Sequence, residues 1–465
     1  MPYSFVGIQT LVINNCYPSV YWETACLIVN SGGNDAFDDV EEKDKSSDEE
    51  EIEIGKKKKK VRNTDYGRIA KALGSIIKEG VTIAPPSVNY SDFTFKPDAK
   101  NDRILYGLKG INGISTDCAA AIIKNRPYTS VEDVLEKCKL KKPQVVNLIK
   151  AGAFDEFGDR RRAMTSYIDS ISDKKKTLNL RNVQMLIRYG MIPSDYSFEV
   201  KVFNFNKYLK ATNKGRKEDY VLDGNSYPFY EQNFDVDLLS NVNGRWVVGA
   251  KDWKKIYDSY MAHIKVFISN NKDELLKELN GKLFKEMWSK YALGNISKWE
   301  MDSVSFYSHE HELKKVKNAV YNISDFSRLK NEPEVDKIIT IKGKDVKLFK
   351  IRRIAGTVID KNKNKNTVTL LTPSGVVDVK LYGEAYAKYD RQISEMGADG
   401  KKHVVEKGWF TRGTLLIVSG IKRGPNSFFA KKYARTPFHL VEKIERVKDD
   451  GFLVTRAERS GEEPE

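Results

Sequence analysis

The chain is 465 residues long, a length that accommodates about three domains. It carries 79 Lys and Arg against 64 Asp and Glu, and the resulting net charge of +15 favours a polyanionic partner. No run of about 18 apolar residues occurs and the first residues lack a signal-peptide pattern, so the sequence predicts a cytoplasmic protein that neither spans a membrane nor is secreted.

The first predicted element is the apolar and aromatic segment 5–29, which indicates two short core helices broken at Pro18. A charged linker follows: residues 35–53 hold eleven acidic residues, and five lysines occupy positions 56–60. Such charge blocks are usually solvated and disordered, and a DNA contact through the lysine run is the alternative.

Residues 64–80 predict an amphipathic helix, with Thr64 as its N-cap and Gly80 just beyond its end. Pro85 and Pro86 then predict extended chain over 81–95, because each proline disfavours the α region for the residue before it. Extended chain therefore connects this helix to the motif that begins at residue 104.

Residues 104–126 carry the most informative motif of the chain. Apolar residues at 104, 105 and 108 predict a short helix, and a Gly-rich turn, 110–115, leads into a second helix over 119–123. Glycine lets the backbone approach a ligand closely, and the N-terminus of the second helix offers N–H groups and a positive dipole end to a phosphate. The pattern predicts a helix-hairpin-helix that holds a nucleic-acid backbone; a helical hairpin that only packs is the alternative.

The candidate DNA contacts of this hairpin are Lys109, Gly113, Ile114, Ser115, Thr116, Lys124 and Arg126. A helix is predicted in 127–138, where Ser130 and Asp133 have capping-box spacing, and another over 141–154 that stops near Gly152. Helical periodicity recurs at 181–189 and 272–290, whereas 196–250, rich in Tyr, Phe, Asn and Gly, predicts loops with short strands.

Five short β-branched or aromatic runs, separated by turn signals, fill residues 346–440. A helix-compatible stretch, 384–390, lies between the third and fourth runs, an order that fits an OB-type barrel. Residues 341–440 contain 21 Lys and Arg and 8 Asp and Glu, a net charge of +13. The chain is therefore predicted to be a multidomain α+β protein, mainly helical in its N-terminal part and ending in a five-stranded OB-type β-barrel.

The barrel carries a second set of candidate DNA contacts that combines cations with aromatic rings for stacking on a single strand. Because side chains alternate between the inside and the outside of a barrel, only one of Phe428 and Phe429 is expected to face the ligand. The full set is Lys361, Lys363, Lys365, Lys380, Tyr382, Lys422, Arg423, Phe428 and Phe429.

In order along the chain, six segments resemble the C-terminal half of the bacterial DNA polymerase III alpha subunit, a C-family polymerase. They are residues 4–27, similar to the end of the fingers; 80–95; 104–134, which contains the hairpin; 145–161, with the sequence VVNLIKAGAFDEFGDRR; 299–313, with His311 at the family's histidine; and the barrel. Residues 166–298 match little of the family.

The resemblance implies a division into domains. These are C-terminal fingers helices at 1–34, a charged disordered linker at 35–63, the end of the fingers region at 64–101, a helix-hairpin-helix DNA-binding domain at 102–165, a lineage-specific insertion and helical connector at 166–345, an OB-fold domain at 346–445 and a flexible tail at 446–465.

Three departures from the family pattern matter. Ser115 stands where the family has glycine, so a strained or reshaped turn is expected, since serine tolerates positive φ poorly. Cys118 replaces an alanine, a mild packing change. The family's palm lies upstream of every segment matched here, so its catalytic carboxylates are expected to be absent. No cofactor is then expected on this chain, Mg²⁺ belongs to the palm portion, and the chain alone is predicted to be inactive.

Other candidate sites are weaker. Asp235 and Asp237 have the acid-x-acid spacing of a metal pair on a strand, but their position after the hairpin argues against that function. A packing or capping role is favoured for His309 and His311, and the sequence predicts no metal site. Two segments beginning at Gln184 and Gln232 resemble sliding-clamp peptides only in part, and core packing is favoured for both. The four cysteines, Cys16, Cys26, Cys118 and Cys138, lack C-x-x-C spacing and predict buried reduced thiols.

Two functional hypotheses follow. In the first, the chain is the C-terminal piece of a split replicative polymerase that completes the fingers, holds duplex product through the hairpin and binds single-stranded template through the barrel. Its partners would be DNA, an N-terminal palm-bearing chain and, as a further candidate, a sliding clamp. Such a split would suit a bacteriophage, placing the protein in the host cytoplasm. The alternative is a stand-alone nucleic-acid-binding accessory protein derived from such a polymerase.

Overall fold

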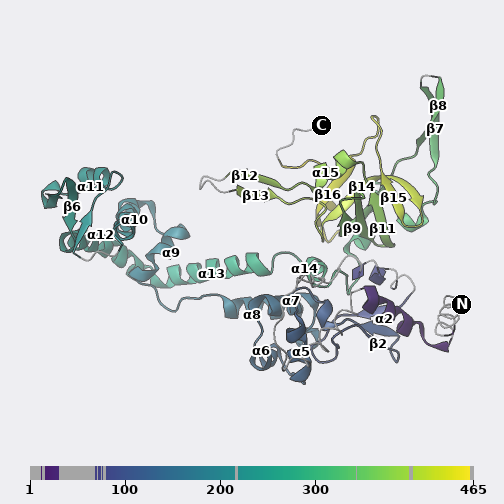
Figure 1. Cartoon of the computed structure of the whole chain (residues 1–465), viewed down its shortest axis with the longest axis horizontal. Helices are drawn as coiled ribbons and strands as arrows, with labels where there is room; N and C mark the ends of the chain where they lie inside the picture. The colour runs from purple at the N-terminus through teal and green to yellow at the C-terminus, as the bar shows by residue number, and fades with distance from the viewer. Residues whose placement is uncertain are drawn as a thin grey trace, which may run out of the picture. The chain divides into compact units, whose positions relative to one another are not determined.

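A computed structural model describes residues 16–30, 80–214, 218–341, 343–396 and 402–460, with Val12 and six positions between residues 69 and 76. The chain divides into two compact units, the first formed by Met1–Thr165 with Gly294–Glu465 and the second by Ser166–Leu293 (Figure 1). The predicted charged linker, 35–63, and Thr64 lie outside the described residues. The described positions between 69 and 76 are helical, and Gly80 has a φ of +91°.

The first element with described bounds in the first unit is α2 (Ser19–Asn30), which starts directly after Pro18, as predicted. A small sheet follows in the order β1-β3-β2, made of Thr82–Ala84, Arg103–Leu105 and Lys96–Asp98. The prediction of a helix around residues 104–108 is therefore wrong: Ile104 pairs with Ile83 on one side and Pro97 on the other. Gly107 then lies so close to the backbone of Thr94 that a Cβ would come within 2.4 Å of its carbonyl carbon, and only the single turn η2 (Leu108–Gly110) precedes the hairpin.

Four helices complete the hairpin region: α5 (Thr116–Lys124), α6 (Val131–Cys138), α7 (Lys142–Ala151) and α8 (Arg160–Ile171). The predicted cap of α6 is confirmed, since the Ser130 hydroxyl accepts a 3.1 Å bond from the Asp133 amide. The Asp133 carboxylate in turn accepts from the amide of Thr129. Gly152, with a φ of +83°, ends α7 as predicted.

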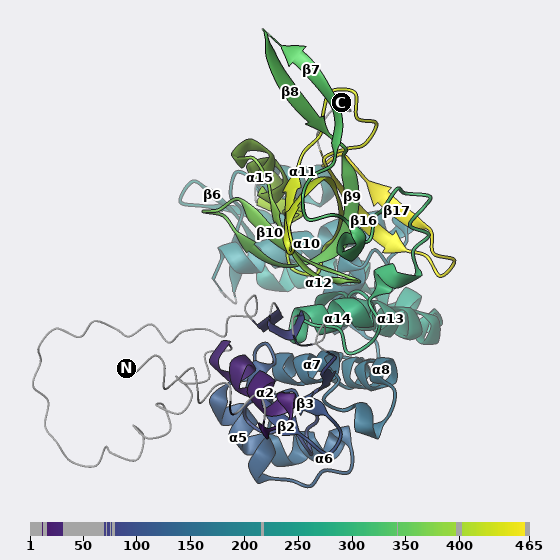
Figure 2. The ribbon, with the colours of Figure 1, turned by 90° about the vertical axis from the view of Figure 1, so that its right-hand side faces the viewer.

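A closed five-stranded barrel forms the C-terminal part of the first unit (Figures 1 and 2). Its strands are β9 (Arg352–Asn362), β10 (Thr367–Thr372), β11 (Gly375–Lys380), β14 (Leu415–Gly424) and β15 (Ser427–Ala430). Neighbours run antiparallel except β11 and β15, which pair in parallel and, with the β14–β15 pairing, close the barrel. Helix α15 (Gly383–Asp390) lies between the third and fourth barrel strands. The predicted fold class is therefore confirmed.

The barrel interior is apolar, and the end helix contributes Tyr386 and Tyr389, which pack near Trp409 and Phe410. Two additional hairpins were not predicted. They are β7 (Val335–Ile341) with β8 (Lys344–Phe349), and β12 (Ile393–Met396) with β13 (Lys402–Glu406).

The C-terminal segment differs from its predicted form as a flexible tail over 446–465. Strand β16 (Val441–Val447) pairs with β17 (Leu453–Arg456) as an extension of the barrel sheet. The buried Arg459 side chain donates a 2.5 Å bond to the Arg391 carbonyl. These contacts hold residues 446–460 against the barrel.

The second unit contains α9 (Val183–Arg188), α10 (Ser197–Thr212), α11 (Tyr227–Asn233), α12 (Ala250–Asn270) and α13 (Lys272–Tyr291). Its strands β4 (Asp219–Val221), β6 (Arg245–Gly249) and β5 (Leu239–Val242) form a small sheet in that order. The helices at 181–189 and 272–290 are thus confirmed. Residues 294–345, predicted as part of the 166–345 insertion, group instead with the first unit. None of the described helices is long and apolar enough to cross a membrane.

Candidate nucleic-acid interface

The turn before α5 has the backbone geometry of a phosphate-binding hairpin. Gly113 adopts a φ of +77°, and a Cβ at this position would come within 2.9 Å of the Asn147 side-chain nitrogen. Ile114 is buried and anchors the turn, whereas Asn112, Gly113 and Ser115 are exposed. An exposed turn followed by a helix N-terminus can place backbone N–H groups against a phosphate.

Ser115 does not strain this turn, so the expected distortion is wrong. The residue has an extended conformation (φ −77°) and serves as the N-cap of α5, its hydroxyl oxygen accepting a 3.3 Å bond from the Cys118 amide. An N-cap hydroxyl that accepts from the helix retains its own hydrogen for donation to a ligand. The serine in the family's glycine position is therefore compatible with binding a phosphate.

The inner side of the turn is tied to helices α7 and α14 (Ile296–Ser303). The Asn112 amide donates to the Ser303 carbonyl at 2.8 Å, and the Asn147 side chain donates to the Asn112 carbonyl at 2.7 Å. The Tyr106 hydroxyl donates to the Val304 carbonyl at 2.9 Å. These bonds hold the turn on the side that faces α7 and α14, whereas Asn112, Gly113 and Ser115 remain exposed.

The predicted hairpin contacts divide into accessible and structural residues. Lys124 is exposed, and Thr116 and Lys109 are half-buried. Arg126 is structural: its guanidinium donates to the carbonyl of Val88 at 2.6 Å and to that of Ser91. Ile114 has no accessible side chain, and its amide donates to the Ile111 carbonyl. The structure therefore gives Arg126 and Ile114 structural roles, which argue against their predicted contacts with DNA.

The structure adds exposed lysines that the motif reasoning missed. These are Lys139, Lys141 and Lys142, at the turn between α6 and α7. The basic run KLKK at residues 139–142 could have identified them from the sequence.

On the barrel, the predicted contacts gather around the β9–β10 turn and the end of β11. Lys363 and Lys365 are exposed in that turn, and Lys380 is exposed on β11. Lys361 is engaged by Asp390, with 2.5 Å between its ammonium nitrogen and the carboxylate oxygen. Tyr382, 62% exposed, meets the half-buried Phe429 edge-on with ring centres 5.1 Å apart. Cations beside an accessible ring pair suit a single strand with unstacked bases.

Strand alternation turns two of the predicted barrel contacts inward, as expected for one of Phe428 and Phe429 and contrary to expectation for Lys422. Phe428 is fully buried in the barrel core. Lys422 is 6% exposed, and its ammonium donates to the carbonyls of Phe326 at 3.0 Å and Leu329 at 2.8 Å. Arg423, the next residue, is exposed, with its guanidinium 5.7 Å from the ring centre of Phe349.

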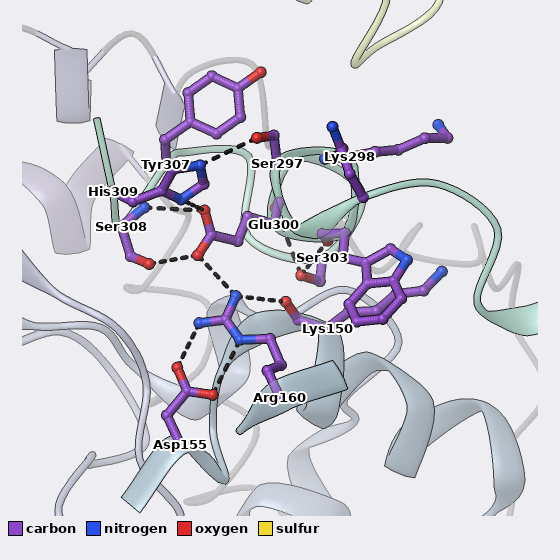
Figure 3. A network of polar contacts seen from close by, with 12 residues as sticks. Lys150, Asp155, Arg160, Ser297, Lys298, Glu300, Ser303, Tyr307, Ser308 and His309 are labelled. Atoms are coloured by element: carbon purple, nitrogen blue, oxygen red, sulfur yellow. Dashed lines mark hydrogen bonds and ion pairs between the residues drawn. The ribbon is translucent and has the colours of Figure 1, made fainter. Parts of the chain in front are cut away.

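A buried ionic network connects the hairpin region to α14 (Figure 3). The Glu300 carboxylate, 1% exposed, accepts bonds from Arg160 at 2.7 Å and from the Ser308 amide at 3.1 Å, and lies 2.9 Å from the His309 ring nitrogen Nδ1. Arg160 also binds Asp155, with 3.0 Å between its Nε and a carboxylate oxygen. The network joins α8, α14 and the segment that leads to the barrel.

The network determines the charge of its members. Burial alone would raise the pKa of Glu300, but hydrogen bonds from His309, Ser308 and Arg160 outweigh it and lower the pKa. The hydrogen bond to Glu300 raises the pKa of His309. Burial lowers the pKa of His311 to about 4, so this ring is neutral and accepts a 3.1 Å bond from the Leu313 amide. The favoured packing and capping role is thus seen for His311, whereas His309 is an ion-pair partner of Glu300.

Asp235 and Asp237 do not form the acid pair on a strand that their spacing suggested. They lie at a 3₁₀ turn, η6 (Val236–Leu238), where the Asp235 carboxylate accepts a 3.0 Å bond from the Asp237 amide. The clamp-like segments also have their apolar residues inside the second unit: Leu186 is buried, and Phe234 packs against Trp253. Among the cysteines of the described ranges, Cys118 is buried and Cys16 is exposed, contrary to the prediction for Cys16.

Comparison with known proteins agrees with these observations. Residues 80–164 match the helix-hairpin-helix motif family. The chain is 40% identical over 471 residues to the probable DNA polymerase YorL of Bacillus subtilis and to the DNA-directed DNA polymerase of Bacillus phage SPbeta. Each alignment covers 99% of this chain but 35% of the relative, so the chain spans about a third of their length. The DNA polymerase III alpha subunit of Thermus aquaticus is 34% identical over 116 residues, 23% of this chain and 9% of that protein.

Proposed function

We propose that this chain, which is related to the C-family DNA polymerases, forms the DNA-binding C-terminal portion of a DNA-directed DNA polymerase. The observation that carries the proposal is the turn at Gly113 and Ser115. Its positive φ, its capped helix and its bonds to α7 and α14 give a rigid, open hairpin within the segment that matches the helix-hairpin-helix family.

In this proposal the two nucleic-acid surfaces have different ligands. The hairpin holds duplex product through its phosphates, because it offers backbone N–H groups and the exposed Lys124 but no ring for stacking. The barrel binds single-stranded template, because Tyr382 and Phe429 lie beside exposed lysines in a region with a net charge of +13. Both contacts are independent of base sequence.

The chemistry of nucleotide transfer is proposed to come from a palm-bearing polypeptide, with the Mg²⁺ ions that such a palm holds. Asp235 and Asp237 do not fit a metal pair, since one carboxylate caps the turn that contains the other. Helix α2, predicted to complete the fingers, exposes Tyr17 before its start and Tyr21 and Val29 along it. This apolar surface suits docking of the palm-bearing part. A cytoplasmic location, in the host for a phage protein, is part of the same proposal.

The test mixes the purified chain with a palm-bearing polypeptide and measures Mg²⁺-dependent primer extension. We expect no extension with either component alone and extension with the mixture, together with salt-sensitive binding of primer–template by this chain. Salt-sensitive DNA binding without co-purification or rescue of extension would favour the accessory-protein alternative. Absence of DNA binding would contradict both hypotheses.

A further inference from the structure

A two-stranded ribbon, β7–β8, projects from the barrel just before β9 (Figures 1 and 2). Its longer strand has seven residues, which corresponds to about 24 Å of extended chain. Most of its described side chains are exposed, and Ile338 and Val346 are among the exposed large apolar residues. A ribbon of this length whose described side chains are mostly exposed to solvent either binds a partner or is prone to aggregate.

The register places aliphatic and basic side chains side by side on both faces of the ribbon. Ile339 is paired with Val346, next to the pair of Lys337 with Leu348 on the same face. On the opposite face, Ile338 is paired with Lys347. Each face therefore offers an apolar surface with an adjacent ammonium group.

The ribbon is basic, because residues 335–350 contain five lysines and two aspartates, a net charge of +3. The Asp345 carboxylate already accepts a 2.8 Å bond from the Thr340 hydroxyl. Within the described part of the chain, Lys337, Lys344 and Lys347 form no ion pair with a carboxylate. Their charges remain available to an anionic ligand.

The base of the ribbon is attached where the barrel surface is also basic. The Phe349 amide donates a 2.9 Å bond to the Tyr433 hydroxyl. The Arg423 guanidinium and the Lys431 ammonium lie 5.7 and 6.0 Å from the centre of the Phe349 ring. Arg423 is at the end of β14 and Phe429 is on β15, so the ribbon continues the barrel surface proposed for single strands.

We propose that the β7–β8 ribbon is a second single-strand-binding element that lengthens the binding track of the barrel. A single strand exposes both phosphates and base faces, which match the ammonium groups and aliphatic side chains of the ribbon. A duplex hides its base faces by stacking, and therefore complements the aliphatic residues poorly. This inference rests on the proposed binding of single strands by the barrel.

The experiment compares oligonucleotides of about 8 and about 24 nucleotides, because one barrel of this type covers roughly 4 to 16 nucleotides. Binding of each to the full chain is measured by fluorescence anisotropy over a range of salt concentrations. The ribbon variant combines Lys337→Gln, Lys344→Gln and Lys347→Gln. The matched control combines Lys272→Gln, Lys277→Gln and Lys285→Gln, three exposed lysines of α13.

We expect the ribbon variant to bind the long oligonucleotide about tenfold more weakly and to lose about 2 from its salt slope, since each contact with a single strand contributes about 0.7. Its affinity for the short oligonucleotide should stay at the wild-type value, as should both affinities of the control variant. An unchanged affinity of the ribbon variant for the long oligonucleotide would overturn the inference and leave a protein partner as the occupant.

The variant Tyr382→Ala separates this inference from the proposed function. If the barrel binds single strands, this variant weakens binding of the short oligonucleotide. Wild-type affinity in Tyr382→Ala would count against the barrel site itself, whereas a defect there combined with a normal ribbon variant would count against the ribbon alone.

Discussion

Gly113 shows how one position combines a conformational and a steric requirement. Its φ of +77° is costly for any residue with a Cβ, and that Cβ would also approach the Asn147 side-chain nitrogen to 2.9 Å. The Asn147 side chain is already bonded to the Asn112 carbonyl, so it cannot move away without releasing the turn. Both requirements act on the loop that is proposed to meet the phosphate.

Gly113→Ala is therefore expected to weaken duplex binding about tenfold, the effect of roughly 1.4 kcal/mol, and to cost about 1–2 kcal/mol of folding stability. Anisotropy with a duplex and urea unfolding measure the two effects. The control Gly244→Ala has nearly the same φ, +78°, but has nothing within 4 Å of the added Cβ, and it lies in the second unit. A loss of duplex binding as large in the control would contradict a specific role for the turn.

Lys422 and Arg423 are adjacent in sequence but are predicted to respond in opposite ways. Lys422→Met leaves the Phe326 and Leu329 carbonyls without this donor, which should cost about 1–3 kcal/mol of stability. Arg423→Gln should leave stability within about 0.5 kcal/mol of wild type and reduce the single-strand salt slope by about 0.7. Urea unfolding and salt-dependent anisotropy on both variants check this, and each variant is the control for the other. A stable Lys422→Met protein with weakened DNA binding would overturn the structural assignment.

These residues also show what the sequence could and could not predict. The cation-rich strand end was visible in the sequence, but which of two neighbouring basic residues points inward depends on the register of β14 with β15 and β9. The conformation of Ser115 depended on whether the serine lies inside the turn or caps the helix that follows it. One residue of offset decides that, and the sequence pattern allows both.

At the scale of elements, the Glu300 network shows why α8, α14 and the segment containing Ser308 and His309 stay together. A carboxylate that is 1% exposed remains ionised because Arg160 and three further donors surround it. The sequence suggested no such role for Glu300, since its partner Arg160 is 140 positions away. Similarly, the local sequence around Ile104 is compatible with a helix or a strand, and it forms a strand because Ile104 pairs with the distant Ile83.

The network predicts a pH dependence carried by His309. Because Glu300 raises the pKa of His309 above 6.5, protonation of the ring contributes stability below the unfolded pKa, and this contribution is lost as the pH rises through the folded pKa. The destabilisation caused by His309→Gln should therefore be larger at about pH 6 than at about pH 9. Urea unfolding at both pH values measures the difference.

Ser308→Ala is the matched control for this prediction. The Ser308 hydroxyl also donates to Glu300, but it does not titrate, so its loss should cost the same stability at both pH values. A destabilisation by His309→Gln that does not change with pH would show that the ring contributes by packing and not by its charge.

At the scale of the whole molecule, a part of the fold could be predicted where its sequence pattern is local. The barrel was predictable because each strand has its own β-branched run and its own turn, such as Gly375 after β10. Residues 196–250 of the second unit were not, because the cluster to which they contribute is rich in Tyr, Phe and Trp side chains that give no clear periodicity. Phe205, Phe234 and Trp253 meet in one aromatic cluster although they are spread over about fifty positions.

The final prediction concerns the independence of the two units. The buried clusters of the second unit, which include Leu186, Ile264 and Trp253, draw all their members from 178–283. Residues 173–292 expressed alone should therefore fold and unfold cooperatively in urea, which the fluorescence of the buried Trp253 can report. Leu279→Ala should lower the stability of this fragment by about 2–5 kcal/mol if the same core is present.

A fragment that contains only the hairpin region, residues 80–172, should behave in the opposite way, although it includes the whole match to the helix-hairpin-helix family. Without α14, Arg160 loses Glu300, and the Asn112 amide and the Tyr106 hydroxyl lose the carbonyls of Ser303 and Val304. The fragment should therefore lack cooperative unfolding and bind duplex weakly, as measured by urea unfolding and anisotropy. A stable fragment with the duplex affinity of the full chain would show that the hairpin needs none of these contacts. If residues 80–172 fail to fold while residues 173–292 fold, α14, which follows the second unit in sequence, is part of the hairpin domain.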